Sequence, residues 1–277
     1  MKVVVSDAAG VCFGVKRALN LVLEEAGKGG ALATLGPLIH NPQVVCQLED
    51  KGIRVVGDIS EIEGGGVVMP SHGVPREVRE AAESAGLRVV DATCPFVATV
   101  HQKARELAEE GYAVVVVGDP GHSEVRAIVS AAGEGARVVS DVEEARAIDW
   151  SGARVGIVSQ TTQVAARFGG VVGVIAAAAR EVVAFNTICY ATTHRQTAAR
   201  ELAPRVQAMF VVGGRNSANT NRLAEICREA GVPTYHIETA SEIREEWVRG
   251  MNTVGLTAGA STPDWLIEEV RTCLERM

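Results

Sequence analysis

Short apolar runs alternate along the chain with longer segments in which apolar and charged residues recur at helical spacing. Valine-rich runs such as residues 114–117 and 210–212 are typical of buried strands. Segments rich in Ala, Glu and Arg, such as residues 102–110 and 222–230, have the period of amphipathic helices. Strands that alternate with helices in this way build parallel sheets covered by helices. The pattern therefore predicts the α/β class.

Three cysteines occupy equivalent places in this pattern. Cys12, Cys94 and Cys189 each follow a strand-like run by a few residues, and each opens a helix-like segment. The residue 28 positions after each of them is polar and lies between an apolar run and a helix, and these residues are His40, His122 and Ser217. The same offset three times indicates an internal repeat.

A second polar residue ends the next apolar run in each third of the chain, and these residues are His72, Thr161 and Ser261. Thr161 lies 28 residues before Cys189, and the 16 residues after Ser261 together with the 12 that reach Cys12 also make 28, whereas His72 lies 22 residues before Cys94. The first strand therefore completes the last repeat. We predict three α/β domains, at residues 13–93, residues 94–188, and residues 189–277 joined by residues 1–12.

Three such domains would share one centre. Ligands of open parallel sheets bind beyond the carboxyl ends of the strands, which is where the cysteines and polar loop residues are expected. We therefore predict a trefoil of three pseudo-equivalent α/β domains around a common site.

Composition narrows the class of protein. With 47% hydrophobic and 22% charged residues among 277, the chain is expected to fold around large cores. A net charge of −7 without a cluster of Lys and Arg argues against nucleic-acid binding. The longest apolar stretch, residues 168–179, is too short to cross a bilayer, and no leader precedes the first strand. We expect a cytoplasmic protein with no membrane or nucleic-acid partner.

The cysteines suggest a metal centre. In a reducing compartment, six cysteines without a CxxC pair are expected to be thiols or ligands, not disulfides. Three thiolates from distant loops suit a soft metal or an iron–sulfur cluster and leave one position open for a substrate. Buried structural thiols are the alternative, and that is what we expect of the three cysteines that lie in helical segments, Cys46, Cys227 and Cys273.

The polar loop residues favour an anionic ligand. They are donors without fixed charge in loops that lead into helix N-termini, a combination that suits a diphosphate. The set comprises His40, His72, His122, Ser217, Asn219 and Ser261. Three other histidines have no repeat partner: His101 and His236 are expected to be structural, and His194 lies close to Cys189.

Glu124 is the best candidate for a general acid. It lies two residues after His122, beyond the strand at residues 114–117, where its carboxyl group could reach a ligand. Alternatively, Glu124 only caps the following helix and favours its positive end by charge. Thr161 offers a hydroxyl group nearby, and it too could instead cap a helix.

Taken together, these motifs resemble the 4-hydroxy-3-methylbut-2-enyl diphosphate reductase family, also called IspH or LytB. The resemblance extends from residue 10 to residue 261. It is carried by Gly10–Val15, Ile39–Asn41, Ser71–Gly73, Asp91–Pro95, Gly121–Glu124, Ser159–Thr162, Cys189–Thr193, Asn216–Leu223 and Thr257–Ser261.

The resemblance implies a trefoil around one iron–sulfur cluster held by Cys12, Cys94 and Cys189. The cluster would be [4Fe-4S] with one iron lacking a protein ligand, or [3Fe-4S] after loss of that iron. It also implies reductive dehydroxylation of 4-hydroxy-3-methylbut-2-enyl diphosphate to isopentenyl and dimethylallyl diphosphates, the last step of the non-mevalonate (MEP/DOXP) pathway.

The resemblance further assigns roles to the loop residues. Glu124 would supply the proton, Thr161 would bind near the substrate hydroxyl, and His122 would lie beside both. The diphosphate would be held by His40, His72, Ser217, Asn219 and Ser261. The implied partners are the allylic diphosphate and an electron donor such as ferredoxin or flavodoxin, and a monomer is expected because a closed trefoil buries its own centre.

Two other functions compete with this interpretation. A non-catalytic iron–sulfur redox sensor would keep the cluster but would need neither Glu124 nor the diphosphate site. A zinc-dependent hydrolase would use Cys and His ligands. The sequence also departs from the family twice, since Ala218 stands where many members have a second serine and His194 where asparagine is common.

Overall fold

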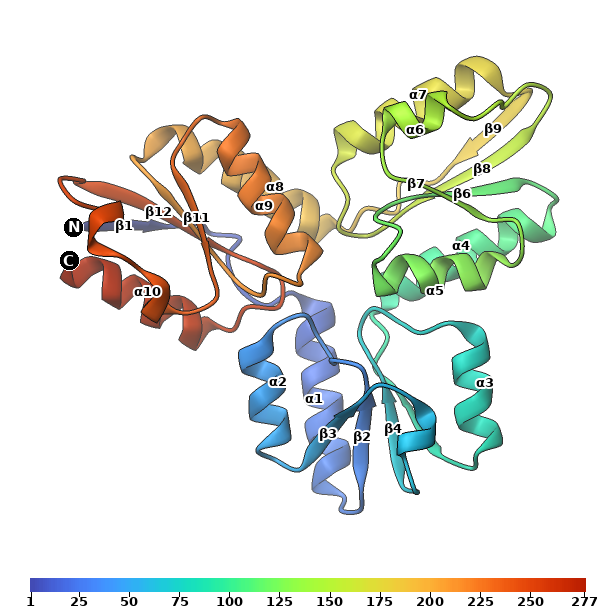
Figure 1. Cartoon of the computed structure of the whole chain (residues 1–277), viewed down its shortest axis with the longest axis horizontal. Helices are drawn as coiled ribbons and strands as arrows, with labels where there is room; N and C mark the ends of the chain where they lie inside the picture. The colour runs from blue at the N-terminus through green and yellow to red at the C-terminus, as the bar shows by residue number, and fades with distance from the viewer. The chain divides into compact units, whose positions relative to one another are not determined.

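The computed structural model describes all 277 residues, which form two compact units. The first comprises Met1–Lys16, His40–Cys46 and Tyr190–Met277, and the second comprises Arg17–Ile39 and Gln47–Cys189. Each is built of parallel strands covered by helices (Figure 1). Four 3₁₀ helices lie in the connections, at Ile59–Glu61, Ala203–Arg205, Ala240–Glu242 and Glu245–Trp247.

The first unit has one four-stranded sheet in the order β1-β12-β10-β11. Its strands are β1 (Lys2–Val5), β10 (Met209–Val212), β11 (Thr234–Ile237) and β12 (Thr253–Ala258). Every pairing is parallel, and β1 at the beginning of the chain pairs with β12 near its end. Its helices are α8 (Tyr190–Leu202), α9 (Ala218–Glu229) and α10 (Asp264–Arg276).

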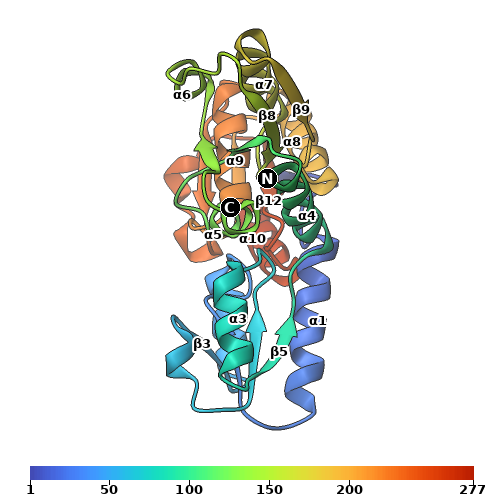
Figure 2. The same ribbon diagram turned by 90° about the vertical axis from the view of Figure 1, so that its right-hand side faces the viewer.

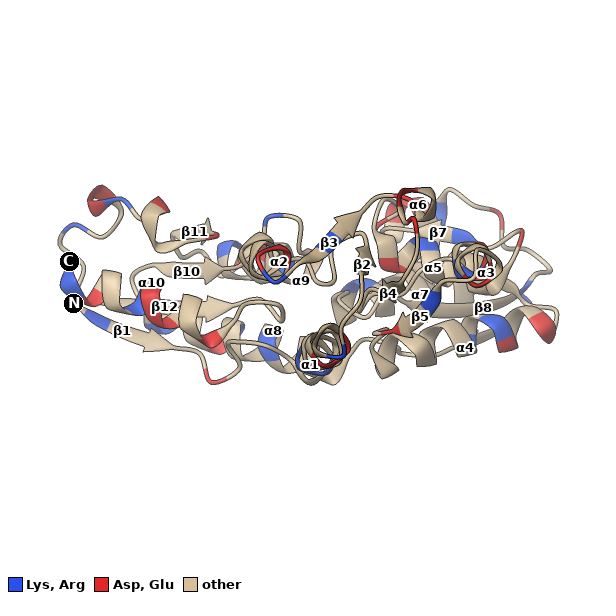
Figure 3. Cartoon of the chain, turned by 90° about the horizontal axis from the view of Figure 1, so that it is seen from below, with Lys and Arg blue, Asp and Glu red and all other residues tan.

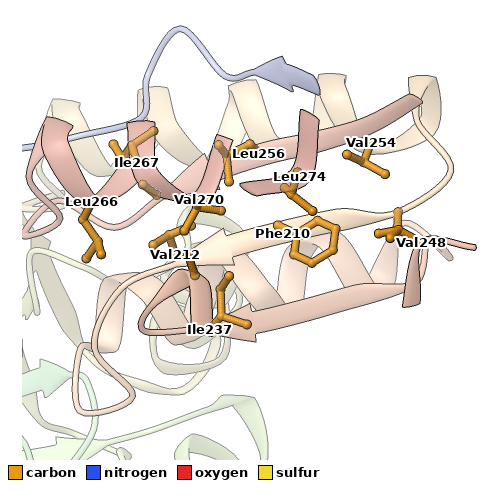
Figure 4. Close-up of a cluster of buried hydrophobic side chains, with 13 residues drawn as sticks. Phe210, Val212, Ile237, Val248, Val254, Leu256, Leu266, Ile267, Val270 and Leu274 are labelled. Carbon is orange, nitrogen blue, oxygen red and sulfur yellow. The ribbon is translucent and has the colours of Figure 1, made fainter. Parts of the chain in front are cut away.

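Two apolar layers cover the two faces of this sheet because successive strand residues point to opposite sides. Phe210 and Val212 pack with α10, where Leu266, Val270 and Leu274 are buried (Figure 4). The intervening residues Met209 and Val211 pack instead with α8 and α9. Parallel strands buried on both faces explain why this segment is continuously apolar.

The second unit contains two sheets, of which the first has the order β3-β2-β4-β5. These strands are β2 (Leu32–Leu35), β3 (Ile53–Val56), β4 (Gly66–Met69) and β5 (Arg88–Asp91), and all pair in parallel. Helix α3 (Arg76–Ser84) buries Ala82 against β4. Helices α1 (Phe13–Gly27) and α2 (Pro42–Glu49) have residues in both units. In the view of Figure 2, β5 is seen between α3 and α1.

The other sheet of the second unit has the order β7-β6-β8-β9 and is also parallel. Val114 and Val116 of β6 pack with α4 and α5, whereas Val115 and Val117 pack with α6 and α7. The strands are β6 (Ala113–Val117), β7 (Arg137–Val139), β8 (Arg154–Ser159) and β9 (Glu181–Ala184). The helices are α4 (Pro95–Glu109), α5 (Ser123–Ala132), α6 (Val142–Arg146) and α7 (Ala165–Ala178).

The predicted fold class is confirmed, since the chain forms three parallel four-stranded sheets, each covered by helices. The three domain boundaries drawn from the spacing stay a prediction. Basic and acidic residues are interspersed along the helices of both units (Figure 3). None of the helices has the length and apolar character needed to span a membrane.

Candidate functional site

The three sheets repeat one order of strands, and the predicted site residues follow equivalent strands in each. The cysteine follows a strand at the sheet edge, β1, β5 or β9. The neighbouring strand, β12, β4 or β8, leads to Ser261, His72 or Thr161, and the strand after that, β10, β2 or β6, leads to Ser217, His40 or His122. The equal offsets along the sequence therefore reflect equal positions in three sheets.

Each cysteine is tied to the neighbouring loop by its own backbone. The N–H groups of Cys12, Cys94 and Cys189 donate to the carbonyl oxygens of Ala260 (3.0 Å), Ser71 (2.9 Å) and Thr161 (3.0 Å), respectively. These acceptors directly precede Ser261 and His72, and the third is Thr161 itself. All three cysteines are half-buried. The fold thus fixes each cysteine beside a predicted substrate-binding residue.

Glu124 and Thr161 meet in the second unit. The Thr161 backbone N–H donates to Glu124 Oε1 at 2.6 Å, and its hydroxyl donates to Oε2 at 2.9 Å. Glu124 is only 3% exposed, and burial raises the pKa of its carboxyl group to about 7, against the lowering effect of the two hydrogen bonds from Thr161. A carboxyl group with this pKa holds and releases a proton near neutral pH.

His122, not Glu124, caps helix α5. Its Nδ1 accepts the backbone N–H of Glu124 at 3.1 Å. Burial, with a smaller effect of Arg126, lowers the pKa of His122 to about 4, so the imidazole is neutral at neutral pH. Thr161 caps no helix either, because α7 begins only at Ala165. Glu124 and Thr161 are therefore not helix caps, although Glu124 does lie in the first turn of α5.

Thr161 connects the carboxyl group to a cysteine. Its N–H and hydroxyl groups bind Glu124, while its carbonyl oxygen accepts from the backbone of Cys189. Hydrogen bonds of a single residue, Thr161, thus connect Glu124 with Cys189. This arrangement holds a proton donor close to a predicted metal ligand.

In the first unit, buried polar atoms without a hydrogen-bond partner gather at the carboxyl ends of β10 and β12. Asn219 is only 3% exposed, and neither its Nδ2 nor its Oδ1 atom has a hydrogen-bond partner. Three atoms of fully buried residues also lack a partner: Asn41 Nδ2, Thr220 Oγ1 and Thr257 Oγ1. Because each such group costs free energy, the cluster fits a polar ligand that satisfies it.

His40, Ser217 and Ser261 belong to the same region of the first unit. Ser261 Oγ donates to the carbonyl oxygen of His40 at 3.0 Å, and Ser217 Oγ accepts the N–H of Thr220 as the N-cap of α9. Glycine is required at Gly259, where a Cβ would lie 2.1 Å from Thr220 Oγ1. The structure therefore brings His40, Ser217, Asn219 and Ser261 into one unit, while His72 and His122 lie in the other.

The loop that carries His72 packs against His101 of α4. A Cβ at Gly73 would lie 2.6 Å from His101 Cε1, and Gly73 has the positive φ of 78° that glycine adopts readily. Burial, assisted by Arg105, lowers the pKa of His101 to about 4. His101 thus has the structural position that the sequence predicts for it.

We expect His101 to make the protein less stable in acid. The unfolded chain takes up a proton near the ordinary pKa of 6.5 and the folded chain only near 4, so stability falls as the pH drops through this range. At about pH 5 the loss is about 2 kcal/mol. Calorimetry should find a smaller fall in Tm between about pH 7 and pH 5 for His101→Gln than for the unmodified protein. Equal falls in Tm would contradict the expectation. His122, whose pKa is also lowered, destabilises both proteins in acid to the same extent and cannot cause a difference between them.

The remaining histidines and cysteines differ in their surroundings. His236 Nε2 lies 2.8 Å from the carbonyl oxygen of Gly213, which agrees with its expected structural role. His194 is exposed and stacks on Tyr190, with ring centroids 6.0 Å apart. The expected burial is confirmed for Cys227, which lies in the apolar layer of α9, and is wrong for Cys46, which is exposed on α2; Cys273 is half-buried.

Sequence reasoning missed Asn41, Thr220 and Thr257 as members of the polar cluster. What distinguishes these three residues is that they are polar and fully buried, and the spacing of residues along the sequence does not reveal burial. Within neither unit does a group of three His, Cys, Asp or Glu side chains form a site for a metal ion. Cys12 belongs to the first unit, and Cys94 and Cys189 belong to the second.

Comparison with known proteins places these features in one family. The family model described as LytB protein matches residues 3–275. A 4-hydroxy-3-methylbut-2-enyl diphosphate reductase of Trichlorobacter lovleyi is 48% identical over 100% of this chain and 99% of its own length. The reductase of the same name from Geobacter sp. strain M21 is 51% identical over 98% of this chain and 95% of its own length.

Two solved structures are also similar over the whole chain. One is (E)-4-hydroxy-3-methyl-but-2-enyl diphosphate reductase, described as the terminal enzyme of the non-mevalonate pathway, with 44% identity, a TM-score of 0.70 and full coverage of both chains. The other is E-1-hydroxy-2-methyl-but-2-enyl-4-diphosphate reductase from Plasmodium falciparum, with 26% identity and a TM-score of 0.93 over 99% of this chain and 87% of that one.

Proposed function

The chain belongs to the LytB protein family, and we propose that it catalyses the reaction of the reductases it resembles. The reaction removes the hydroxyl group of 4-hydroxy-3-methylbut-2-enyl diphosphate with two electrons and two protons and releases water. Its products are isopentenyl and dimethylallyl diphosphates, formed in the last step of the non-mevalonate pathway. A non-catalytic redox sensor is not favoured, because full-length relatives are named as reductases.

The family implies an iron–sulfur cluster, and the donor set of this chain fits one. Three half-buried cysteines stand at equivalent sheet edges, and thiolates are the usual ligands of such clusters. Cys12, Cys94 and Cys189 would hold a [4Fe-4S] cluster, which becomes [3Fe-4S] if the iron without a protein ligand is lost. When bound, the cluster supplies the electrons and a Lewis-acidic iron.

Glu124 holds the proton that the departing hydroxyl group requires. Hydroxide is a poor leaving group, so a nearby acid accelerates its departure by donating a proton. With a pKa of about 7, about half of the Glu124 carboxyl groups are protonated at pH 7, and the protonated form is still acidic enough to donate. Thr161 orients the carboxyl group through two hydrogen bonds. The link from Glu124 through Thr161 to Cys189 is the observation that carries the proposal.

The diphosphate is held by uncharged donors. Ser217, Asn219 and Ser261 offer side-chain and backbone donors at the N-terminus of α9 and the end of β12, where the helix dipole favours an anion. The unpartnered polar atoms of Asn219 support this role most directly. His40, His72 and His122 complete the set.

The Asn219→Ala variant should separate binding from stability. Loss of a hydrogen bond to a charged group costs about 1.5–3 kcal/mol, so KM should rise roughly tenfold to a hundredfold. Because the Asn219 side-chain atoms have no partner in the protein, Tm should stay the same or rise. Asn221→Ala on the same helix is the control, since Asn221 only donates to the Arg215 carbonyl oxygen. An unchanged KM in Asn219→Ala would remove this residue from the binding site.

Anaerobic turnover tests the function itself. Protein purified without oxygen is mixed with a chemically reduced viologen, with and without 4-hydroxy-3-methylbut-2-enyl diphosphate, and iron and sulfide are measured in parallel. Substrate-dependent oxidation with formation of both five-carbon diphosphates is expected. A folded sample that contains iron and sulfide but does not turn over would contradict the proposal.

The proposed function also implies an electron donor, an oligomeric state and a compartment. We expect a small electron-transfer protein such as ferredoxin or flavodoxin as donor, and a monomer as the active species. The cytoplasm is the expected compartment, because it keeps the cysteine ligands reduced.

A further inference from the structure

In the first unit, Arg195 connects a helix to the loop that precedes Cys12. It lies on α8, the helix that follows Cys189, and is only 5% exposed. Its Nη1 donates to the Ala191 carbonyl oxygen of the same helix at 3.0 Å. Its Nη2 donates to the carbonyl oxygen of Gly10, two residues before Cys12.

Arg17 makes an equivalent connection in the second unit. It lies on α1, the helix that follows Cys12, and is half-buried. Its Nη1 donates to the carbonyl oxygen of Thr93 at 3.2 Å, and Thr93 directly precedes Cys94. In both cases an arginine on the helix after one cysteine binds the backbone just before another cysteine.

The third cysteine loop is fixed by the end of the neighbouring strand β8. Thr187, two residues before Cys189, has its hydroxyl group within hydrogen-bond distance of both Ser159 N (2.7 Å) and Ser159 O (2.6 Å). Each of the three cysteines thus has a residue one or two positions before it that is held by a hydrogen bond to another element. For Cys12 and Cys94 the bond comes from an arginine on a helix, and for Cys189 it comes from a threonine of the loop itself.

Packing alone does not account for these arginines. A buried guanidinium group loses solvation, which costs several kcal/mol before its hydrogen bonds compensate. An apolar side chain would fill the same space at lower cost. The planar fork of arginine can bind two carbonyl oxygens at once, which lysine cannot do with the same geometry. Each arginine therefore supplies a positively charged group that fixes the backbone just before a cysteine.

We propose that Arg17 and Arg195 are positioning residues of the cluster, which fix the backbone before Cys94 and Cys12. This inference rests on the proposed function, in which the three cysteines hold the cluster. Groups behind the direct ligands set the orientation of those ligands, and their loss weakens metal binding about tenfold to a hundredfold. The positive charges also favour electron uptake by the cluster, since nearby charge sets its potential.

Cluster retention tests the proposal without any use of substrate. Arg17→Gln, Arg195→Lys and Arg195→Gln are loaded anaerobically with iron and sulfide, and loss of visible absorbance is followed in a chelator. We expect the cluster to be lost at least about tenfold faster from each variant than from the unmodified protein, and the midpoint potential to be lower in the two Gln variants. Arg200→Gln, exposed on the same helix as Arg195, should behave like the unmodified protein.

Three results would overturn the proposal. Rates of loss equal to that of Arg200→Gln would show that the arginines do not support the cluster. Retention by Arg195→Lys equal to that of the unmodified protein would show that charge, not position, matters. If the unmodified protein binds no iron and sulfide, the proposed function fails and this inference fails with it. Arg17→Gln keeps the test valid if the buried Arg195 variants do not fold, which Tm of the cluster-free proteins reveals.

Discussion

Glu124→Gln should abolish turnover while leaving the fold and the cluster intact. A positioned general acid contributes about 10²–10⁴-fold to the rate, and the amide cannot donate its proton in place of the carboxyl group. The side chains have nearly the same shape, and the amide oxygen can still accept the N–H of Thr161 while its NH₂ group donates to the Thr161 hydroxyl. Anaerobic viologen oxidation, with iron and sulfide analysis, measures both outcomes.

The control for this variant is Glu77→Gln. Glu77 also lies in the first turn of a helix of the second unit and accepts from a hydroxyl group, that of Ser130 at 2.7 Å, but it is exposed. We expect it to retain full activity. The unmodified enzyme should also slow as the pH rises through about 7, because Glu124 then loses the proton it must donate. Full activity in Glu124→Gln would remove the residue from the mechanism.

A single change of Cys12, Cys94 or Cys189 to serine should remove both cluster and activity. A serine hydroxyl is a much poorer ligand for iron than a thiolate, and each cysteine would supply one of only three protein ligands. Bound iron and sulfide should fall by more than about tenfold, since loss of an outer partner alone has that effect. Elemental analysis and activity should fall together in all three variants.

The other three cysteines provide matched controls. Cys46→Ser and Cys273→Ser should leave cluster content and activity nearly unchanged, because these thiols lie in helices away from the strand ends. Cys227 is fully buried among apolar side chains, so a serine there would bury a hydroxyl group and cost stability for an unrelated reason. Cys227→Ala is therefore the appropriate control. Equal effects at all six positions would contradict a shared cluster.

Much of the site could be predicted because the fold repeats. Parallel strands end at the same edge of a sheet, so the offset of 28 residues from Cys94 to His122 already located two strand ends. The same reasoning applies to Thr161 and Cys189, which the structure connects directly through their backbones. Offsets report such positions well because they depend on strand and helix lengths, which the hydrophobic pattern reveals.

The missing parts depend on contacts that no local pattern encodes. Thr220 and Thr257 read as ordinary helix and strand residues, and only their full burial without a partner reveals a polar cluster. Arg195 reads as a solvated helical arginine but reaches a carbonyl oxygen 185 positions away in the chain. Residues 40–46, which include the start of α2, lie in the sequence range of the predicted first domain, yet they belong to the unit that contains Ser261.

The pairing of β1 with β12 also governs when the enzyme can be completed during synthesis. β1 is made before the other eleven strands but has only one neighbour in its sheet, and that neighbour, β12, is the last of the twelve to be made. Residues 17–39 and 47–189 can form their unit while translation continues, because domains generally fold as they emerge. Cys12 has no fixed place until about 250 further residues have been made. Iron and sulfide delivered to a nascent chain would therefore meet Cys12 before its loop is fixed, and insertion of the proposed cluster is expected only after β12 has paired with β1.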